Sequence, residues 1–344
     1  MSDLEMQPAI ELQPATENQH GMSWKRFSVY VILNLIVLGL VQLWCWLGRG
    51  LPDPFFPSPV TILQICGCIA SLIQIVVFVP SFALQTERVY DVVGSLTYVV
   101  CLLYTLLTGM RVNQWEIDLR AVLGTCCALV WAVRLGGFLF LRRSKANVMD
   151  TRFTHLMPHF IRYLFVWNVQ GLWVVSGMLP IFILNSTQNR APFLATDAVG
   201  GVLFCCGLGL EMVADRQKSL FKANPANKGK WIDTGFWYYS RHPNYFFEWV
   251  VQLGLFLIAV AEFEGSQFVG VVGPVFVALL LWFLSGVPIL ERSANAKWAN
   301  DEEYMIYRKR TSVCIPFFKF VPSSQHAQLS LPRRWIVADG FWDE

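Results

Sequence analysis

Residues 60–84 read VTILQICGCIASLIQIVVFVPSFAL and contain no charged side chain. A helix of about 20 apolar residues is long enough to cross the hydrocarbon core of a bilayer. This stretch therefore predicts a transmembrane helix, and it sets the class of the fold. Runs of the same character recur along the chain, at residues 27–47, 60–84, 92–110, 121–141, 160–184, 198–212, 245–261 and 268–290.

The composition of the whole chain agrees with this pattern. Of its 344 residues, 55% are hydrophobic and 15% are charged, and the mean hydropathy is +0.45. Soluble domains carry about a quarter charged residues. The sequence therefore predicts an all-α, polytopic membrane bundle of about eight transmembrane helices. The sixth run, 198–212, is short and rich in glycine, which is compatible with a tilted or partly interfacial helix.

Charge and cysteine content argue against two other classes of function. A net charge of +3 gives no electrostatic basis for binding nucleic acid. The nine cysteines lie almost entirely within apolar runs and lack the spacing of metal ligands. We therefore expect them to be small core side chains, and we expect no metal site.

The distribution of basic residues predicts how the chain crosses the membrane. With the N-terminus in the cytosol, 21 of the 27 Lys and Arg residues fall in inner segments and 4 in outer loops, while Arg134 and Arg162 fall within spans. This asymmetry matches the positive-inside rule and predicts that both termini are cytosolic. The longest inner segments are 142–159, 214–244 and 291–344, so a soluble cofactor would bind on the cytosolic side.

The second of these segments, with its flanks, carries most of the polar chemistry. Residues 211–245 read EMVADRQKSLFKANPANKGKWIDTGFWYYSRHPNY. Lys218 and Lys222 lie one helical turn apart, where they could hold a phosphate group. Contact with lipid headgroups would explain the same two lysines, so the spacing leaves both readings open.

Glu248 follows this segment, about one turn into an otherwise apolar span. An ionisable residue in such a place is costly unless it is paired or hydrated, so it is a candidate functional residue. Arg241, Asn244 and Tyr245 precede it by seven, four and three positions, and all could face the same side. An ion pair of Glu248 with Arg241 that only closes the bundle is the structural alternative.

Polar residues in other spans call for partners as well. Arg134 needs an acidic partner or a hydrated cavity, unless its side chain reaches the interface. Asn168 and Gln170 are two positions apart and so face different sides of a helix, which predicts hydrogen bonds to two neighbouring helices. After the eighth span, residues 291–318 predict a polar, aromatic helix that either closes a cofactor groove or lies in the interface.

Several motifs together resemble those of the steroid 5α-reductase-like membrane proteins, and most closely their DUF1295 branch. They are ADRQKSLFK at 214–222, ANPANKGKW at 223–231 and DTGFWYYSRHPNYFFE at 233–248. The resemblance covers roughly residues 88–320. It divides the chain into a disordered cytosolic tail (1–24), an N-terminal transmembrane hairpin (25–87), the family domain (88–320) and a C-terminal cytosolic tail (321–344).

This resemblance implies an NADPH-dependent reductase that acts on a carbon–carbon double bond in a sterol-like or long-chain lipid. For a eukaryotic chain it also implies the endoplasmic reticulum. Lys222 stands where sterol reductases carry arginine, so it keeps the charge without the bidentate geometry. The residues that the resemblance assigns to cofactor binding are Lys218, Lys222, Trp237, Arg241, His242 and Asn244. The candidate catalytic residues, as proton donors, are Tyr245, Glu248 and Tyr239.

Two alternatives remain open from the sequence. Membrane methyltransferases that use S-adenosylmethionine, of the isoprenylcysteine and phospholipid types, share the RHPxY element found here at 241–245. Their paired-glutamate segment is not clear in this chain, because Glu302 and Glu303 lack the preceding arginine. The other alternative is a non-catalytic membrane protein that retains the fold.

Overall fold

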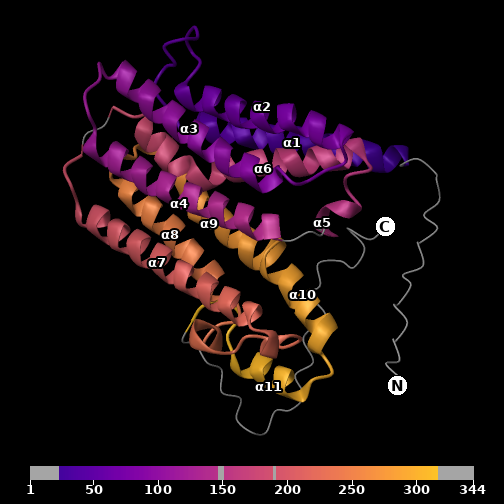
Figure 1. Cartoon of the computed structure of the whole chain (residues 1–344). Coiled ribbons are helices and arrows are strands. Elements are labelled where there is room, and N and C mark those ends of the chain that lie inside the picture. The colour runs from indigo at the N-terminus through magenta and orange to yellow at the C-terminus, as the bar shows by residue number, and fades with distance from the viewer. Residues whose placement is uncertain (1–22, 146–150, 189–190, 317–344) are drawn as a thin grey trace, which may run out of the picture.

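The computed structural model describes residues 23–145, 151–188 and 191–316, and within these ranges it contains helices and no named strand. Eight helical segments are long and apolar enough to cross a membrane (Figure 1). Seven are single helices: α1 Trp24–Leu47, α2 Ile62–Ala83, α3 Tyr90–Val112, α4 Leu119–Lys145, α6 Phe160–Asn185, α7 Ala195–Ala223 and α8 Pro243–Ala259.

The eighth segment is composite, and short elements complete the chain. It joins η4 Gly265–Val271, α9 Val272–Leu279, the π-helical turn η5 Leu280–Leu284 and α10 Val287–Trp298. The short elements are α5 Thr151–Thr154, η1 Pro225–Asn227, η2 Gly235–Tyr238, η3 Val260–Glu262 and α11 Glu302–Arg310. The prediction of an all-α bundle with eight spans is confirmed. The predicted tails, 1–24 and 321–344, lie outside the described residues apart from Ser23 and Trp24.

Helix α6 forms the centre of the bundle. Its most apolar window is 83% buried, whereas the corresponding share in the other spans is 17–50%. The predicted interhelical hydrogen bonds are present: Asn168 donates to Asn34 Oδ1 of α1 at 2.6 Å, and Gln170 donates to the Tyr90 carbonyl of α3 at 2.9 Å. These bonds fix the rotation of α6 against two neighbours on different sides.

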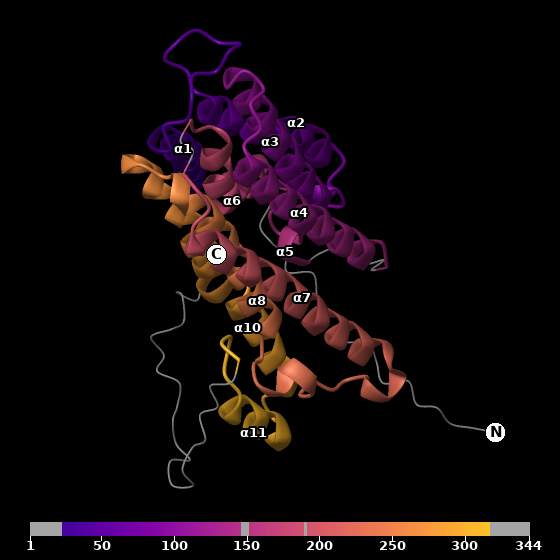
Figure 2. The same ribbon diagram turned by 90° about the vertical axis from the view of Figure 1, so that its left-hand side faces the viewer.

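Helix α7 is longer than the sixth apolar run suggested. It has 29 residues and continues past the run to Ala223. Gly200 of α7 and Gly254 of α8 allow the two helices to pack closely (Figure 2): a Cβ on Gly200 would lie 2.7 Å from the Gly254 carbonyl oxygen, and one on Gly254 would lie 2.6 Å from the Phe204 nitrogen. A small residue is required at both positions, because the two backbones nearly touch. These two glycines therefore serve helix packing.

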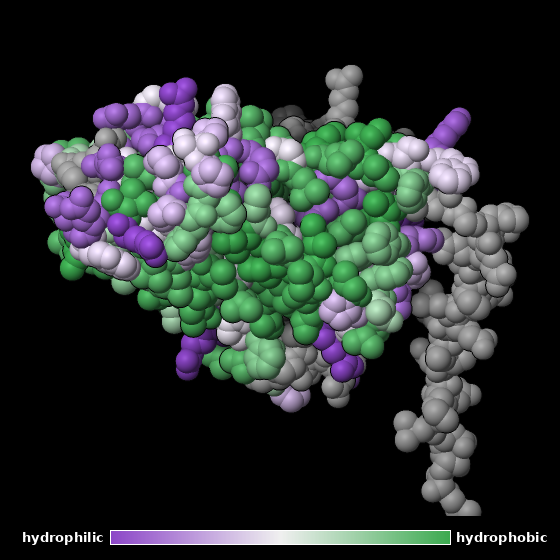
Figure 3. All heavy atoms as spheres, turned by 90° about the horizontal axis from the view of Figure 1, so that it is seen from above, coloured by the Kyte–Doolittle hydropathy of each residue, from purple (hydrophilic) through white to green (hydrophobic). Residues whose placement is uncertain are grey.

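The connections gather at two ends of the bundle (Figure 1). One end, called the cap end here, holds Ser23, α5, the segment between α7 and α8, and α11. The opposite end, called the far end, holds the α1–α2, α3–α4, α6–α7 and α8–α9 connections. Between the two ends, the surface shows a broad apolar band, with polar side chains gathered toward the ends (Figure 3). This pattern is that of an integral, multi-pass membrane protein.

Candidate functional site

The segment between α7 and α8 folds back against α7 through specific turn residues. Asn224 accepts a hydrogen bond from the Ala226 amide at 3.0 Å, which caps η1. Gly235 adopts φ +62°, and a Cβ there would lie 2.6 Å from the Gln217 side chain. Glycine therefore allows Gln217 to accept from the Phe236 amide at 3.0 Å. These contacts place residues 235–242 beside the last turns of α7.

Lys218 and Trp237 form the first pair of the predicted site. Trp237 is 2% exposed and donates from Nε1 to the Ala214 carbonyl at 3.0 Å. The Lys218 ammonium lies 4.3 Å from the centroid of the Trp237 ring, a cation–π contact that holds it in place. Trp237 therefore acts as a platform for Lys218. Lys222 lies one turn further along α7 and is exposed.

A buried ionic cluster continues from this pair into the bundle. Arg134 of α4 is paired with Glu211 and, at 2.6 Å, with Asp215 Oδ2, so the predicted need for an acidic partner is confirmed. Asp215 Oδ1 also accepts from Asn244 Nδ2 at 3.2 Å. The cluster thus links α4, α7 and the first turn of α8, and it brings Asn244 to the carboxylates of α7.

Glu248 belongs to the same cluster. It is 7% exposed and lies within electrostatic reach of Arg134, Asp215 and Glu211. Glu211 and Asp215 therefore pair directly with the Arg134 guanidinium, and a third carboxyl group, on Glu248, is buried within its electrostatic reach. Such an excess of acid is costly in a low-dielectric environment unless protons or a ligand compensate it.

Further buried polar atoms lie near Glu248 without a partner. Gln252, one turn deeper in α8, is 1% exposed, and neither of its amide atoms is hydrogen-bonded within the part of the chain that the structure describes. The same holds for Trp131 Nε1, whose ring lies 5.2 Å from that of Tyr98. Tyr98 is itself in electrostatic reach of Glu248. Sequence reasoning missed Gln252 and Tyr98, although a glutamine one turn after a buried glutamate is a detectable signal.

Arg241 does not pair with Glu248, so the alternative of a Glu248–Arg241 clamp is wrong. Its Nε contacts Glu291 Oε1 at 3.0 Å, and its Nη1 donates to the carbonyls of Arg308 and Thr311, both at 2.7 Å. The reason is geometric: Arg241 precedes α8, and the segment after α11 lies beside it through the Ser240–Ser312 bridge. Arg241 therefore anchors α10 and α11 at the cap end.

The remaining predicted site residues lie in different surroundings. His242 is 5% exposed, contacts Glu291 Oε1 through Nε2 at 2.9 Å, and stacks on Tyr245 with ring centroids 5.8 Å apart. Tyr239 is 38% exposed and lies beside Tyr238, with ring centroids 5.1 Å apart. The structure thus places Tyr239 at the surface of the cap end, whereas Glu248 is in the interior.

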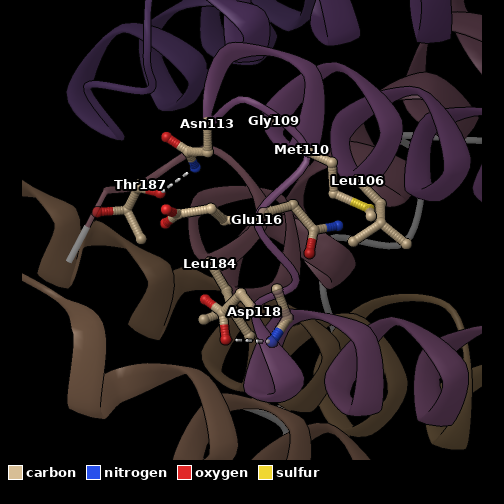
Figure 4. A pocket seen from close by; sticks show the side chains of 10 residues that line it. Leu106, Gly109, Met110, Asn113, Glu116, Asp118, Leu184 and Thr187 are labelled. Atoms are coloured by element: carbon tan, nitrogen blue, oxygen red, sulfur yellow. Dashed lines mark hydrogen bonds between the residues drawn. The ribbon is translucent and has the colours of Figure 1, made fainter. Parts of the chain in front are cut away.

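A pocket lined by both polar and apolar residues also occurs at the far end, away from this site (Figure 4). Asn113 donates there to the Thr187 carbonyl at 3.4 Å, and Asp118 accepts from the amides of Arg120 and Ala121. These contacts terminate α3 and begin α4. We therefore assign this pocket a structural role.

The fold and the cluster together define a class: a polytopic α-helical membrane protein with a buried ionic site between α4, α7 and α8, below a polar cap. The chain belongs to the DUF1295 family, described as "Protein of unknown function (DUF1295)", whose model matches residues 77–311.

One curated relative is similar over a short stretch. The protein named "Probable O-methyltransferase ustE", from Ustilaginoidea virens, is 44% identical over 54 residues. This stretch is 16% of the present chain and spans only 18% of the relative's length. No solved structure matches the chain.

Proposed function

We propose that the protein is a membrane-embedded, NADPH-dependent reductase of a carbon–carbon double bond in a sterol-like or long-chain lipid. The observation that carries this proposal is the excess of carboxyl groups around Arg134. One of these groups, on Asp215, accepts a hydrogen bond from Asn244. NADPH would supply the hydride. Glu211 and Asp215 would favour the positive charge that the nicotinamide ring would carry after hydride transfer.

The residues present fit this cofactor. Lys218 and Lys222 provide cations for phosphates at the polar end of α7, and Asn244 provides an amide for the uncharged carboxamide. The buried Nδ1 of His242 has no partner among the described residues and offers a further acceptor. Basic groups near the surface and acidic groups inside match a cofactor that is polyanionic at one end only.

Glu248 is the proposed proton donor. Reduction of the double bond requires one proton in addition to the hydride, and Glu248 is the buried acid at the inner end of the cluster. Its carboxyl lies within electrostatic reach of Arg134 and Asp215. We propose that the cap end faces the cytosol, where the basic residues gather and soluble NADPH is available.

A methyltransferase that uses S-adenosylmethionine is the second candidate, because of the partial similarity to a protein named as a probable O-methyltransferase. The buried carboxylates could attract the sulfonium cation. That charge is lost during methyl transfer, however, so the same carboxylates would stabilise the ground state more than the transition state. The electrostatics therefore favour the reductase.

Ligand titration of the purified protein in nanodiscs discriminates these candidates. We expect thermal stabilisation by NADPH, equivalent to about 2.7 kcal/mol at a concentration 100 times Kd. Transfer of deuterium from labelled NADPH into a lipid extract would identify the substrate. Stabilisation by S-adenosylmethionine alone would overturn the reductase assignment, and stabilisation by neither would favour a non-catalytic protein.

Replacing Asn244 by alanine tests the placement of the cofactor. We expect NADPH affinity to fall about 5- to 30-fold, the equivalent of one or two hydrogen bonds, with little change in melting temperature. Asn295→Ala on α10 is the matched control, since its amide only accepts from Tyr304 at the long distance of 3.4 Å. Unchanged affinity in Asn244→Ala would remove this residue from the site.

A further inference from the structure

Glu291 lies 49 positions after His242 in the sequence, yet its carboxylate meets the His242 ring. Within the eighth segment, the π-helical turn η5 and the bend at Ser285 and Gly286 separate α10 from α9 and change the direction of the chain. In this position Glu291 Oε1 lies 2.9 Å from His242 Nε2. Neither the motif around His242 nor the resemblance assigns a role to Glu291.

Two arginines hold Glu291 as an ionised acceptor. Arg241 Nε lies 3.0 Å from Oε1, and Arg308 Nε lies 3.7 Å from Oε2. A carboxylate paired in this way accepts hydrogen bonds and cannot donate them. Nε2 of His242 must therefore carry a proton, which fixes the tautomer of the ring.

The opposite nitrogen of the ring is then an acceptor without a partner. His242 is 5% exposed, and Nδ1 is buried with no hydrogen bond within the described ranges. Burial lowers the pKa of His242; the hydrogen bond and charge of Glu291 raise it, and Lys218 and Arg241 lower it further. The net shift keeps the ring neutral at pH 7, so Nδ1 retains its lone pair.

We propose that Glu291 is a positioning residue that holds His242 Nδ1 as a hydrogen-bond acceptor for a ribose hydroxyl of the bound cofactor. The inference rests on the proposed cofactor-dependent function of the same site. A buried acceptor left unpaired costs free energy, which a ligand donor recovers on binding. Ribose hydroxyls are donors that NADPH and S-adenosylmethionine share, so the chemistry does not depend on which of them is bound.

A pair of substitutions at His242 separates the two ring nitrogens. In His242→Gln the amide nitrogen can replace Nε2 and keep the bond to Glu291, but no acceptor remains at the position of Nδ1. In His242→Asn the amide oxygen can replace Nδ1, but the bond to Glu291 is lost. We expect His242→Gln to bind the cofactor about 5- to 50-fold more weakly with an unchanged melting temperature.

The companion variant should show the reverse behaviour. We expect His242→Asn to bind within about 5-fold of wild type while melting at a lower temperature, because Glu291 loses a partner. If His242 had only a structural role, His242→Asn would bind the cofactor more weakly than His242→Gln, or the two variants would bind it equally well. Wild-type affinity in His242→Gln, or equal weakening in both variants, would overturn the role of Nδ1.

Glu291→Gln tests the positioning role. Glutamine can donate a hydrogen bond as well as accept one, so it no longer fixes the tautomer of the His242 ring. We expect weaker cofactor binding, by about 3- to 20-fold, in the wild-type background and no further loss in His242→Asn. Glu302→Gln in the first turn of α11 is the control. The positioning role of Glu291 would be overturned by wild-type cofactor affinity in Glu291→Gln. An equal further loss of affinity when Glu291→Gln is added to His242→Asn would also overturn it.

The ligands used are NADPH and S-adenosylmethionine, titrated separately against the full-length protein in nanodiscs. If wild type binds NADPH and His242→Gln binds it equally well, the inference fails and the reductase proposal stands. If wild type binds only S-adenosylmethionine, the reductase proposal fails, and the same variants decide the inference with that ligand. If wild type binds neither, both fail.

Discussion

Replacing Arg120 by methionine is expected to destabilise the protein by about 3–5 kcal/mol. Arg120 is 3% exposed at the far end, where Nε lies 2.7 Å from Asp197 Oδ1 and Nη1 contacts Glu262. It also donates to the carbonyls of Ala191 at 3.0 Å and Pro192 at 2.7 Å. The residue thus joins the start of α4 to the start of α7 and the end of α8.

The loss arises mainly from the groups that Arg120 leaves behind. Two buried carboxylates would lose the cation that compensates their charge, and two carbonyls would lose the donor that Arg120 provides. Chemical or thermal unfolding in detergent measures the effect. Arg111→Met is the control, because the Arg111 guanidinium lies at the same end of the bundle, 4.6 Å from the centroid of the Phe55 ring. Adding Asp197→Asn and Glu262→Gln should restore part of the stability, because uncompensated charge is removed. A change below about 1 kcal/mol in Arg120→Met would contradict this account.

The largest effect on activity is expected from Glu248→Gln. Glutamine keeps the shape of the side chain but cannot release a proton, so the proposed reductase should slow by about 10²- to 10⁴-fold in kcat. Such a factor corresponds to about 3–5 kcal/mol in the barrier. NADPH affinity should change less than about 3-fold, since a protonated carboxyl and an amide are both neutral and the substitution leaves the charge of the cluster unchanged.

The measurement is transfer of deuterium from labelled NADPH to lipid, at saturating cofactor. Stability provides a second readout: exchanging a protonated carboxyl for a neutral amide of the same shape should leave the melting temperature nearly unchanged. Glu303→Gln, in the first turn of α11, is the matched control and should retain activity. A Glu248→Gln protein that reduces substrate at the wild-type rate would assign the proton to another group.

The sequence singled out several residues of the ionic cluster but not their contacts. Arg134 and Glu248 stand out because each is an ionisable residue in an apolar run. The acid that neutralises Arg134 could not be read from spacing, since Asp215 lies 81 positions away. Glu291 was recognised only as part of a polar helix, and its contact with His242 depends on the bend between η5 and α10.

Arg241 shows why spacing within one helix can mislead. A continuous helix through residues 241–248 would place Arg241 and Glu248 on one side. The structure begins α8 at Pro243, and His242 has φ −138° and ψ 57°, so Arg241 leaves the helix axis. Its side chain then meets Glu291 and the segment after α11.

By itself, the sequence determined the eight spans, the family and the location of the polar segment. Each of these depends on local hydropathy or on contiguous motifs, because the bilayer acts on every apolar run in the same way. Only the tertiary structure decided which charges pair, since pairing depends on how α4, α7, α8 and α10 rotate and cross. Those angles are set by helix packing between residues far apart in the chain, such as the close backbone approach of Gly200 to Gly254.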